Sequence, residues 1–83
     1  MQKYILLTRN NSGFYLDKVS VMASLEFSKE ILQSMVLANK NANRAEIIEG
    51  DRDYIGDFRV KPLRKFYVNF PHRDLVEEID ENN

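Results

Sequence analysis

The chain has 83 residues, of which 43% are hydrophobic and 30% charged, and its net charge is −1. A chain of this length forms one domain with a small core, burying about 60 to 65% of the surface that its unfolded form exposes. It contains no cysteine, which excludes a disulfide framework and a thiolate zinc site. No stretch reaches transmembrane length, and the amino terminus lacks a signal-peptide pattern, so we expect a soluble cytoplasmic protein with no membrane partner.

The first part of the chain predicts a β-hairpin. Residues 3 to 9 (KYILLTR) have apolar side chains at both odd- and even-numbered positions, which is typical of a central strand with neighbours on either side. Residues 10 to 13 (NNSG) are turn formers, and the extended pattern resumes in residues 14 to 20 (FYLDKVS).

A helix is predicted next. Apolar residues recur at helical spacing between Phe27 and Ala38 and form one stripe. Ser24 precedes this stripe as the predicted N-cap, and residues 39 to 43 (NKNAN) provide residues that end helices.

The second half of the chain predicts three more strands. Residues 44 to 49 (RAEIIE) and 54 to 60 (YIGDFRV) read as an antiparallel pair joined by a turn. Pro62 interrupts pairing, so residues 64 to 70 (RKFYVNF) are expected on a sheet edge or packed elsewhere. The resulting β-β-α-β-β-β order predicts a two-layer α+β sandwich, in which an antiparallel sheet of four or five strands carries the long helix on one face.

Residues 1 to 73 are predicted to form this single α+β domain, and residues 74 to 83 an acidic C-terminal tail. Asp74 and Glu77 approximate a capping box, and the apolar residues from Leu75 to Ile79 have the spacing of a short helix. The tail has only acidic charges and follows a basic segment, so we expect it to be able to fold back and screen that segment.

No catalytic or metal-binding pattern stands out. The only histidine, His72, has no nucleophile arranged around it, and no serine lies in a glycine-flanked elbow. A metal-dependent nuclease would have to use Glu46, Glu49, Asp51 and Asp53, whose spacing matches neither a calcium loop nor an E-x-K pair. We therefore predict that the chain is not an enzyme and has no metal site and no cofactor.

One segment, residues 59 to 73, combines cations with aromatic rings and contains no acid. Strand alternation directs the even-numbered residues from Arg64 to Phe70 toward the core and the odd-numbered residues from Lys65 to Asn69 outward. The candidate residues for binding a partner or nucleic acid are Arg59, Lys61, Arg64, Lys65, Tyr67 and Arg73.

Two interpretations of this segment remain open. An edge strand protected by cations permits a protein partner or a second copy to add a strand, which predicts a small non-catalytic protein-interaction domain. Such a domain resembles in size the regulators and inhibitors that phages and mobile elements encode. Alternatively, the cations and Tyr67 make weak, salt-sensitive contacts with RNA or single-stranded DNA, which predicts a nucleic-acid-binding accessory protein.

Overall fold

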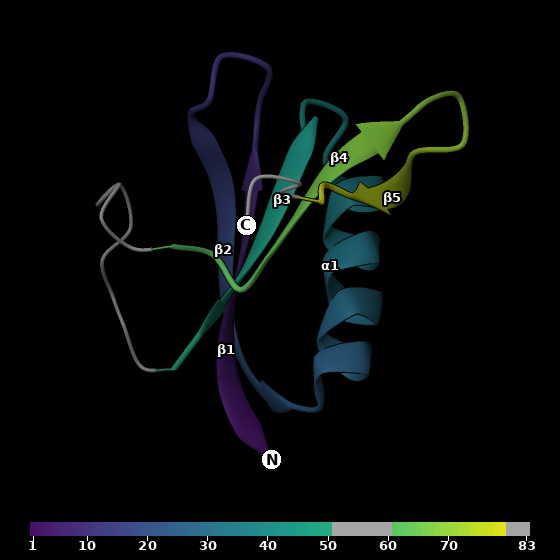
Figure 1. Cartoon of the computed structure of the whole chain (residues 1–83). Coiled ribbons are helices and arrows are strands. Elements are labelled where there is room, and N and C mark those ends of the chain that lie inside the picture. The colour runs from purple at the N-terminus through teal and green to yellow at the C-terminus, as the bar shows by residue number, and fades with distance from the viewer. Residues whose placement is uncertain (51–60, 80–83) are drawn as a thin grey trace.

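The computed structural model describes residues 1–50 and 61–79, which form one antiparallel sheet and one helix (Figure 1). The sheet has five strands in the order β2-β1-β3-β4-β5. The elements in chain order are β1 (Gln2–Arg9), β2 (Tyr15–Ala23), α1 (Leu25–Ala38), β3 (Arg44–Glu49), β4 (Arg64–Asn69) and β5 (Asp74–Glu77). The predicted α+β fold, its β-β-α-β-β-β order and the helix on one face of the sheet are confirmed.

The last strand, β5, corrects the prediction of a short helix in the acidic tail. It pairs antiparallel with β4 from Asn69↔Asp74 to Phe66↔Glu77, and Leu75 packs against the core. A leucine that points inward between two outward-pointing neighbours is compatible with a strand and with a helical turn. The segment becomes a strand because β4 lies beside it as a pairing partner. The predicted strand over residues 54 to 60 lies outside the described residues.

β4 lies inside the sheet, between β3 and β5, so its predicted edge position is wrong. Pro62 precedes the first residue of the strand, where a missing N–H removes no bond of the ladder. The backbone N–H of Leu63 already donates to the Ile47 carbonyl, at 2.7 Å. The two edges of the described sheet are therefore β2 and β5.

The main core lies between α1 and one face of the sheet. It contains Tyr4 and Leu6 of β1, Leu32 and Val36 of α1, and Phe66 of β4, among others. Residues of β1 with the other parity belong to a second buried cluster, formed by Ile5, Leu7 and Ile48. This explains why β1 is apolar on both parities, and it confirms the prediction of a central strand.

Both ends of α1 are fixed by side chains. Ser24 is the N-cap, as predicted, because its Oγ accepts a hydrogen bond from the Phe27 backbone N–H at 3.1 Å. At the other end, the Nδ2 of Asn39 donates to Oδ2 of Asp17 at 3.0 Å. The same carboxylate oxygen accepts from Oγ1 of Thr8 at 3.2 Å, so Asp17 joins β2, β1 and the end of the helix.

Candidate interaction site

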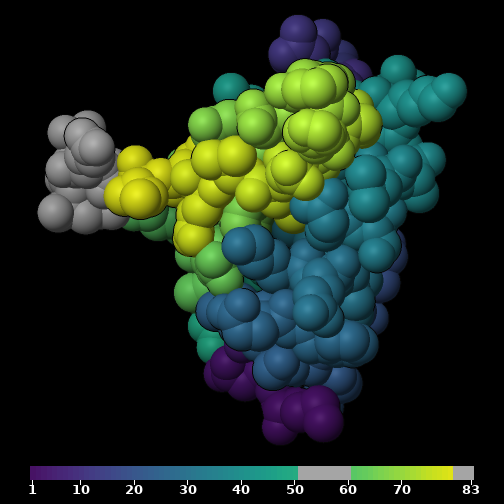
Figure 2. Space-filling view, turned by 90° about the vertical axis from the view of Figure 1, so that its right-hand side faces the viewer, coloured from purple at the N-terminus to yellow at the C-terminus, as the bar shows by residue number. Residues whose placement is uncertain are grey.

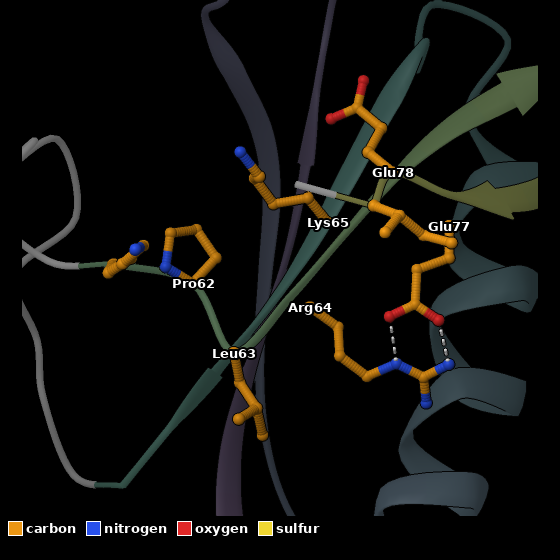
Figure 3. A pocket seen from close by; sticks show the side chains of 8 residues that line it. Pro62, Leu63, Arg64, Lys65, Glu77 and Glu78 are labelled. Atoms are coloured by element: carbon orange, nitrogen blue, oxygen red, sulfur yellow. Dashed lines mark hydrogen bonds and ion pairs between the residues drawn. The ribbon is translucent and has the colours of Figure 1, made fainter. Parts of the chain in front are cut away.

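Arg64 is held by contacts within the domain. Its Nε and Nη2 donate to the two carboxylate oxygens of Glu77, at 3.0 and 2.6 Å (Figure 3). Its Nη1 lies 3.9 Å from Oε1 of Glu26, and its guanidinium carbon lies 5.2 Å from the centre of the Phe66 ring. These contacts hold the pKa of Arg64 above its ordinary value, chiefly through the hydrogen bond to Glu77. The guanidinium is therefore already used for stability.

Arg73 is also engaged within the fold. Its Nη2 donates to the carbonyls of Val36, Asn39 and Ala42 at 3.0, 2.8 and 2.9 Å, and its Nη1 to that of Lys40 at 3.3 Å. A cation at this place satisfies carbonyls that the end of a helix leaves without a partner. In Figure 2, β5 and the turn before it lie against α1. Arg73 is thus a structural clamp between that turn and the helix.

Gln33 makes a second contact between α1 and the turn. Its Nε2 donates to the Arg73 carbonyl at 2.9 Å, and its Oε1 accepts from the Leu75 N–H at 3.0 Å. One side chain therefore satisfies both a donor and an acceptor of the turn. The sequence pattern gives no sign of this contact, because the backbone partners of Gln33 are about 40 residues away along the chain.

The strand alternation predicted for residues 64 to 69 is confirmed. Phe66 and Val68 are buried on the helix side, and Lys65 and Tyr67 are exposed on the other side. Phe70, predicted to face the core, is 58% exposed, because β4 ends at Asn69 and the alternation ends with it. Arg59 lies outside the described residues.

A groove with a volume of about 300 Å³ lies where β5 ends beside the start of β4 (Figure 3). Its lining comes from two segments, residues 61–65 and 77–79. The N–H of Glu78 donates to the Lys65 carbonyl at 2.8 Å and joins the two segments. Two apolar side chains of the lining, Leu63 and Ile79, are 46% and 80% exposed. We call this feature the β4–β5 groove.

Counting only the described residues, the β4–β5 groove carries positive charge that no acid neutralises. Glu77 is neutralised by Arg64, and Glu78 forms an ion pair with Arg44. Lys61 and Lys65 are exposed, and no acid among residues 1–50 and 61–79 pairs with either of them. Within the described ranges, the groove therefore presents two ammonium groups without acidic partners beside apolar contact area.

The structure brings three of the six predicted binding residues to the groove, namely Lys61, Arg64 and Lys65. Tyr67 and Arg73 lie elsewhere, on the outer sheet face and at the end of α1. The lining residues Leu63, Glu77, Glu78 and Ile79 were missed. The signal that would have found them is the strand pairing of residues 74–77, which brings them beside β4.

The acidic cluster considered for a metal does not assemble in the part of the chain that the structure describes. Glu46 pairs with Arg9, and Glu49 accepts a hydrogen bond from Gln2 at 2.6 Å. Asp51 and Asp53 lie outside the described residues. No group of three or more His, Asp or Glu side chains suited to a metal ion occurs within the described ranges.

Comparison of the chain with protein-family models, with curated proteins and with solved structures found no match. Among the described residues, no helix combines the length and apolar character needed to cross a membrane. Any function must therefore be argued from the surface of the domain itself.

The ion pair beneath the groove predicts a pH dependence of stability. The hydrogen bond from Arg64 lowers the pKa of Glu77, and burial opposes this effect in part. A carboxyl with a depressed folded-state pKa stabilises the fold above its unfolded pKa, and this stability is lost as the pH falls through the folded value. The window therefore lies below about pH 4.5, the ordinary value for this group.

We expect Glu77→Gln to lower the free energy of unfolding at about pH 7, by less than about 1 kcal/mol because the pair is partly exposed. The difference between the variant and the wild type should be smaller at about pH 3, because the falling pH protonates the Glu77 carboxyl and weakens its ion pair with Arg64. Urea unfolding at both pH values measures this. Glu30→Gln, on the exposed face of α1, is the matched control, and an equal loss at the two pH values would contradict the prediction.

Proposed function

We propose that this chain is a small non-catalytic protein-interaction domain that binds an extended, acidic segment of a partner protein in the β4–β5 groove. One observation carries the proposal: two lysines without acidic partners in the described chain flank exposed apolar side chains at a sheet edge. We also propose its setting, a cytoplasmic regulator or inhibitor of the kind that phages and mobile elements encode. The lack of a catalytic pattern in its sequence supports a role in binding rather than in catalysis.

The backbone of the described chain leaves space for an extended ligand. β5 has four residues and ends at Glu77, and one more bond follows, from the Glu78 N–H to Lys65. Past this point the start of β4 has no neighbour on that side among the described residues. Residues 61–63, beside this space, are not in a strand, Pro62 has no N–H, and the Leu63 N–H already donates to Ile47. We therefore expect side chains, more than added main-chain hydrogen bonds, to hold an extended ligand along the line of β5.

The side chains favour acidic and apolar residues in that ligand. Lys61 and Lys65 attract carboxylates, and each exposed pair contributes about 0.2–1 kcal/mol. Leu63 and Ile79 offer apolar surface, whose burial supplies affinity that salt does not weaken. The combination predicts a peptide in which acids and apolar residues alternate.

Nucleic-acid binding, the alternative function, receives less support. It relied on five cations and one ring, and two of those cations, Arg64 and Arg73, are committed to contacts within the domain. Stacking platforms for single strands combine several exposed rings with cations. Tyr67, 42% exposed, is the one ring exposed on β4.

Selection of a random peptide library on the immobilised full chain tests the proposal. We expect enrichment of peptides with alternating acidic and apolar residues. A synthetic, fluorescent copy of the enriched sequence should then bind about tenfold more weakly to Lys61→Glu and to Lys65→Glu, a loss equivalent to about 1.4 kcal/mol. Lys40→Glu, an equal charge reversal outside the groove, should stay within about twofold of the wild type.

Two outcomes would overturn the proposal. One is a negative peptide experiment, in which no peptide is enriched or all three variants lose binding equally. The other is saturable binding of a fluorescent oligo-uridine or oligo-thymidine probe at about 150 mM salt, weakening steeply with salt and lost in Lys61→Ala with Lys65→Ala. That second result would replace the peptide ligand by single-stranded nucleic acid.

A further inference from the structure

We propose that two copies of this chain associate through β2, antiparallel to each other about a two-fold axis at Ser20, and so extend both sheets into one. β2 forms the edge of the described sheet opposite β5 (Figure 1). The surface is thus separate from the β4–β5 groove, and the dimer does not rest on the proposed peptide binding.

The hydrogen-bonding pattern shows which backbone groups of β2 face outward. The carbonyls of Lys3 and Arg9 in β1 point toward β3. They accept hydrogen bonds from the backbone N–H groups of Gly50 and Asn43, at 2.8 Å each. Because strand residues alternate, the even-numbered residues of β1 direct their backbone groups toward β2. Their partners there are odd-numbered, as in Leu6↔Val19. The even-numbered residues of β2, including Ser20, therefore direct their N–H and carbonyl groups away from β1.

This edge has little of the protection that prevents strands from pairing, because Asp17 and Lys18 are the only charged residues of β2. Its one irregularity lies near its start, where the register with β1 shifts between Thr8 and Arg9. Residues 17 to 23 are regular and contain neither proline nor glycine. The other edge, β5, is short and begins and ends with an acid. Short and charged edge strands are the usual protection against association, so β2 is the edge open to a second strand.

The exposed side chains of β2 fit a second copy. Val19 shares the helix side of the sheet with Leu6 and is 38% exposed. Val21, on the same side, packs at the border of the core. With the axis at Ser20, Val19 of each copy lies opposite Val21 of the other, twice per dimer. Such β-branched pairs across strands stabilise a sheet, and these extend the two cores toward each other.

Charge disfavours registers whose axis lies nearer the start of β2. An axis at Lys18 would place the two copies of that lysine opposite each other, which is destabilising. An axis at Val19 would set the Asp17 carboxylate against Val21. The axis at Ser20 opposes Lys18 to Met22 and Asp17 to Ala23, so no like charges face each other and Asp17 keeps its bonds to Thr8 and Asn39.

Single cysteines test the register directly, because the chain has no cysteine of its own. In the proposed dimer the two Ser20 Cα atoms form a hydrogen-bonded pair about 5.5 Å apart, which is within disulfide range. We expect Ser20→Cys to form a covalent dimer under mild oxidation. Met22→Cys alone should not, because its two copies lie about 14 Å apart along the strands. Ser12→Cys, in the exposed hairpin turn, measures crosslinking by random collision.

Sedimentation of the wild-type full chain should show a dimer, and Ser20→Pro should convert it into a folded monomer. Proline removes an N–H that points away from β1, so the β1–β2 ladder is kept, and circular dichroism checks this. Ser20→Thr is the control that retains the dimer. A wild-type monomer at about 1 mM, or Ser12→Cys crosslinking as fast as Ser20→Cys, would overturn the proposal. If Ser20→Pro unfolds, the cysteine comparison still decides.

Discussion

Phe66→Ala should lower the free energy of unfolding by about 3–5 kcal/mol. A domain of this length has a total stability of about 4–12 kcal/mol, so the loss is at least about a quarter of that stability and at most all of it. Phe66 is 1% exposed and lies at the centre of β4, opposite Ala45. Removing its ring leaves a cavity in a core too small to close over it.

Two cations add to this cost. The Lys29 Nζ lies 5.7 Å and the Arg64 guanidinium carbon 5.2 Å from the centre of the Phe66 ring. Contacts of this kind contribute about 0.5–1 kcal/mol each at exposed sites, and both are lost with the ring. Urea unfolding followed by circular dichroism measures the change.

Tyr67→Ala is the matched control for Phe66→Ala, because it removes a ring from the next residue of the same strand. Tyr67 faces away from the helix and is 42% exposed, so its loss should cost about 1 kcal/mol. Equal costs for the two variants would mean that burial of Phe66 does not stabilise the fold as argued. Phe66→Leu, which keeps most of the apolar volume, should cost less than the alanine variant.

Arg73→Ala should be the next most destabilising change, at about 2–4 kcal/mol. The guanidinium donates to four backbone carbonyls at the end of α1 and in the following loop. Alanine leaves these acceptors without their partner and removes one of the two side-chain links between the β4–β5 turn and the helix, while Gln33 still provides the other. Chemical unfolding measures the loss. Arg73 lies outside the β4–β5 groove, so a folded Arg73→Ala protein should still bind the peptide. Its folding has to be verified before its binding is interpreted.

The backbone of Arg73 allows two effects to be separated. Its φ of 61° lies in the left-handed region, which costs about 1 kcal/mol for a residue with a Cβ. Arg73→Gly loses the same hydrogen bonds but relieves this strain, so it should be about 1 kcal/mol more stable than Arg73→Ala. A glycine variant as stable as the wild type would mean that the guanidinium contributes only about 1 kcal/mol, which is as much as the strain that glycine relieves.

Local patterns in the sequence are sufficient to predict most of the strands and the helix. β1 was predicted as central because its apolar residues occupy both parities, and two buried clusters now use them. α1 was predicted from one apolar stripe with Ser24 as its cap, and both are present. In each case the deciding physics acts within about one turn or one strand of the same segment.

Only the tertiary structure decided the last strand and the use of the basic segment. The segment DLVE is too short to choose between strand and helical turn, and it becomes β5 because β4 provides a partner. That pairing brings Glu77 to Arg64 and places the turn residue Arg73 at the end of α1. Composition suggests that Arg64 and Arg73 bind an external partner. In the structure, Arg64 instead binds the Glu77 carboxylate, and Arg73 binds backbone carbonyls of the same chain. Local sequence patterns indicate which segments become strands or helix and where the cations are concentrated. Long-range strand pairing determines which of these cations bind groups of the same chain and which do not.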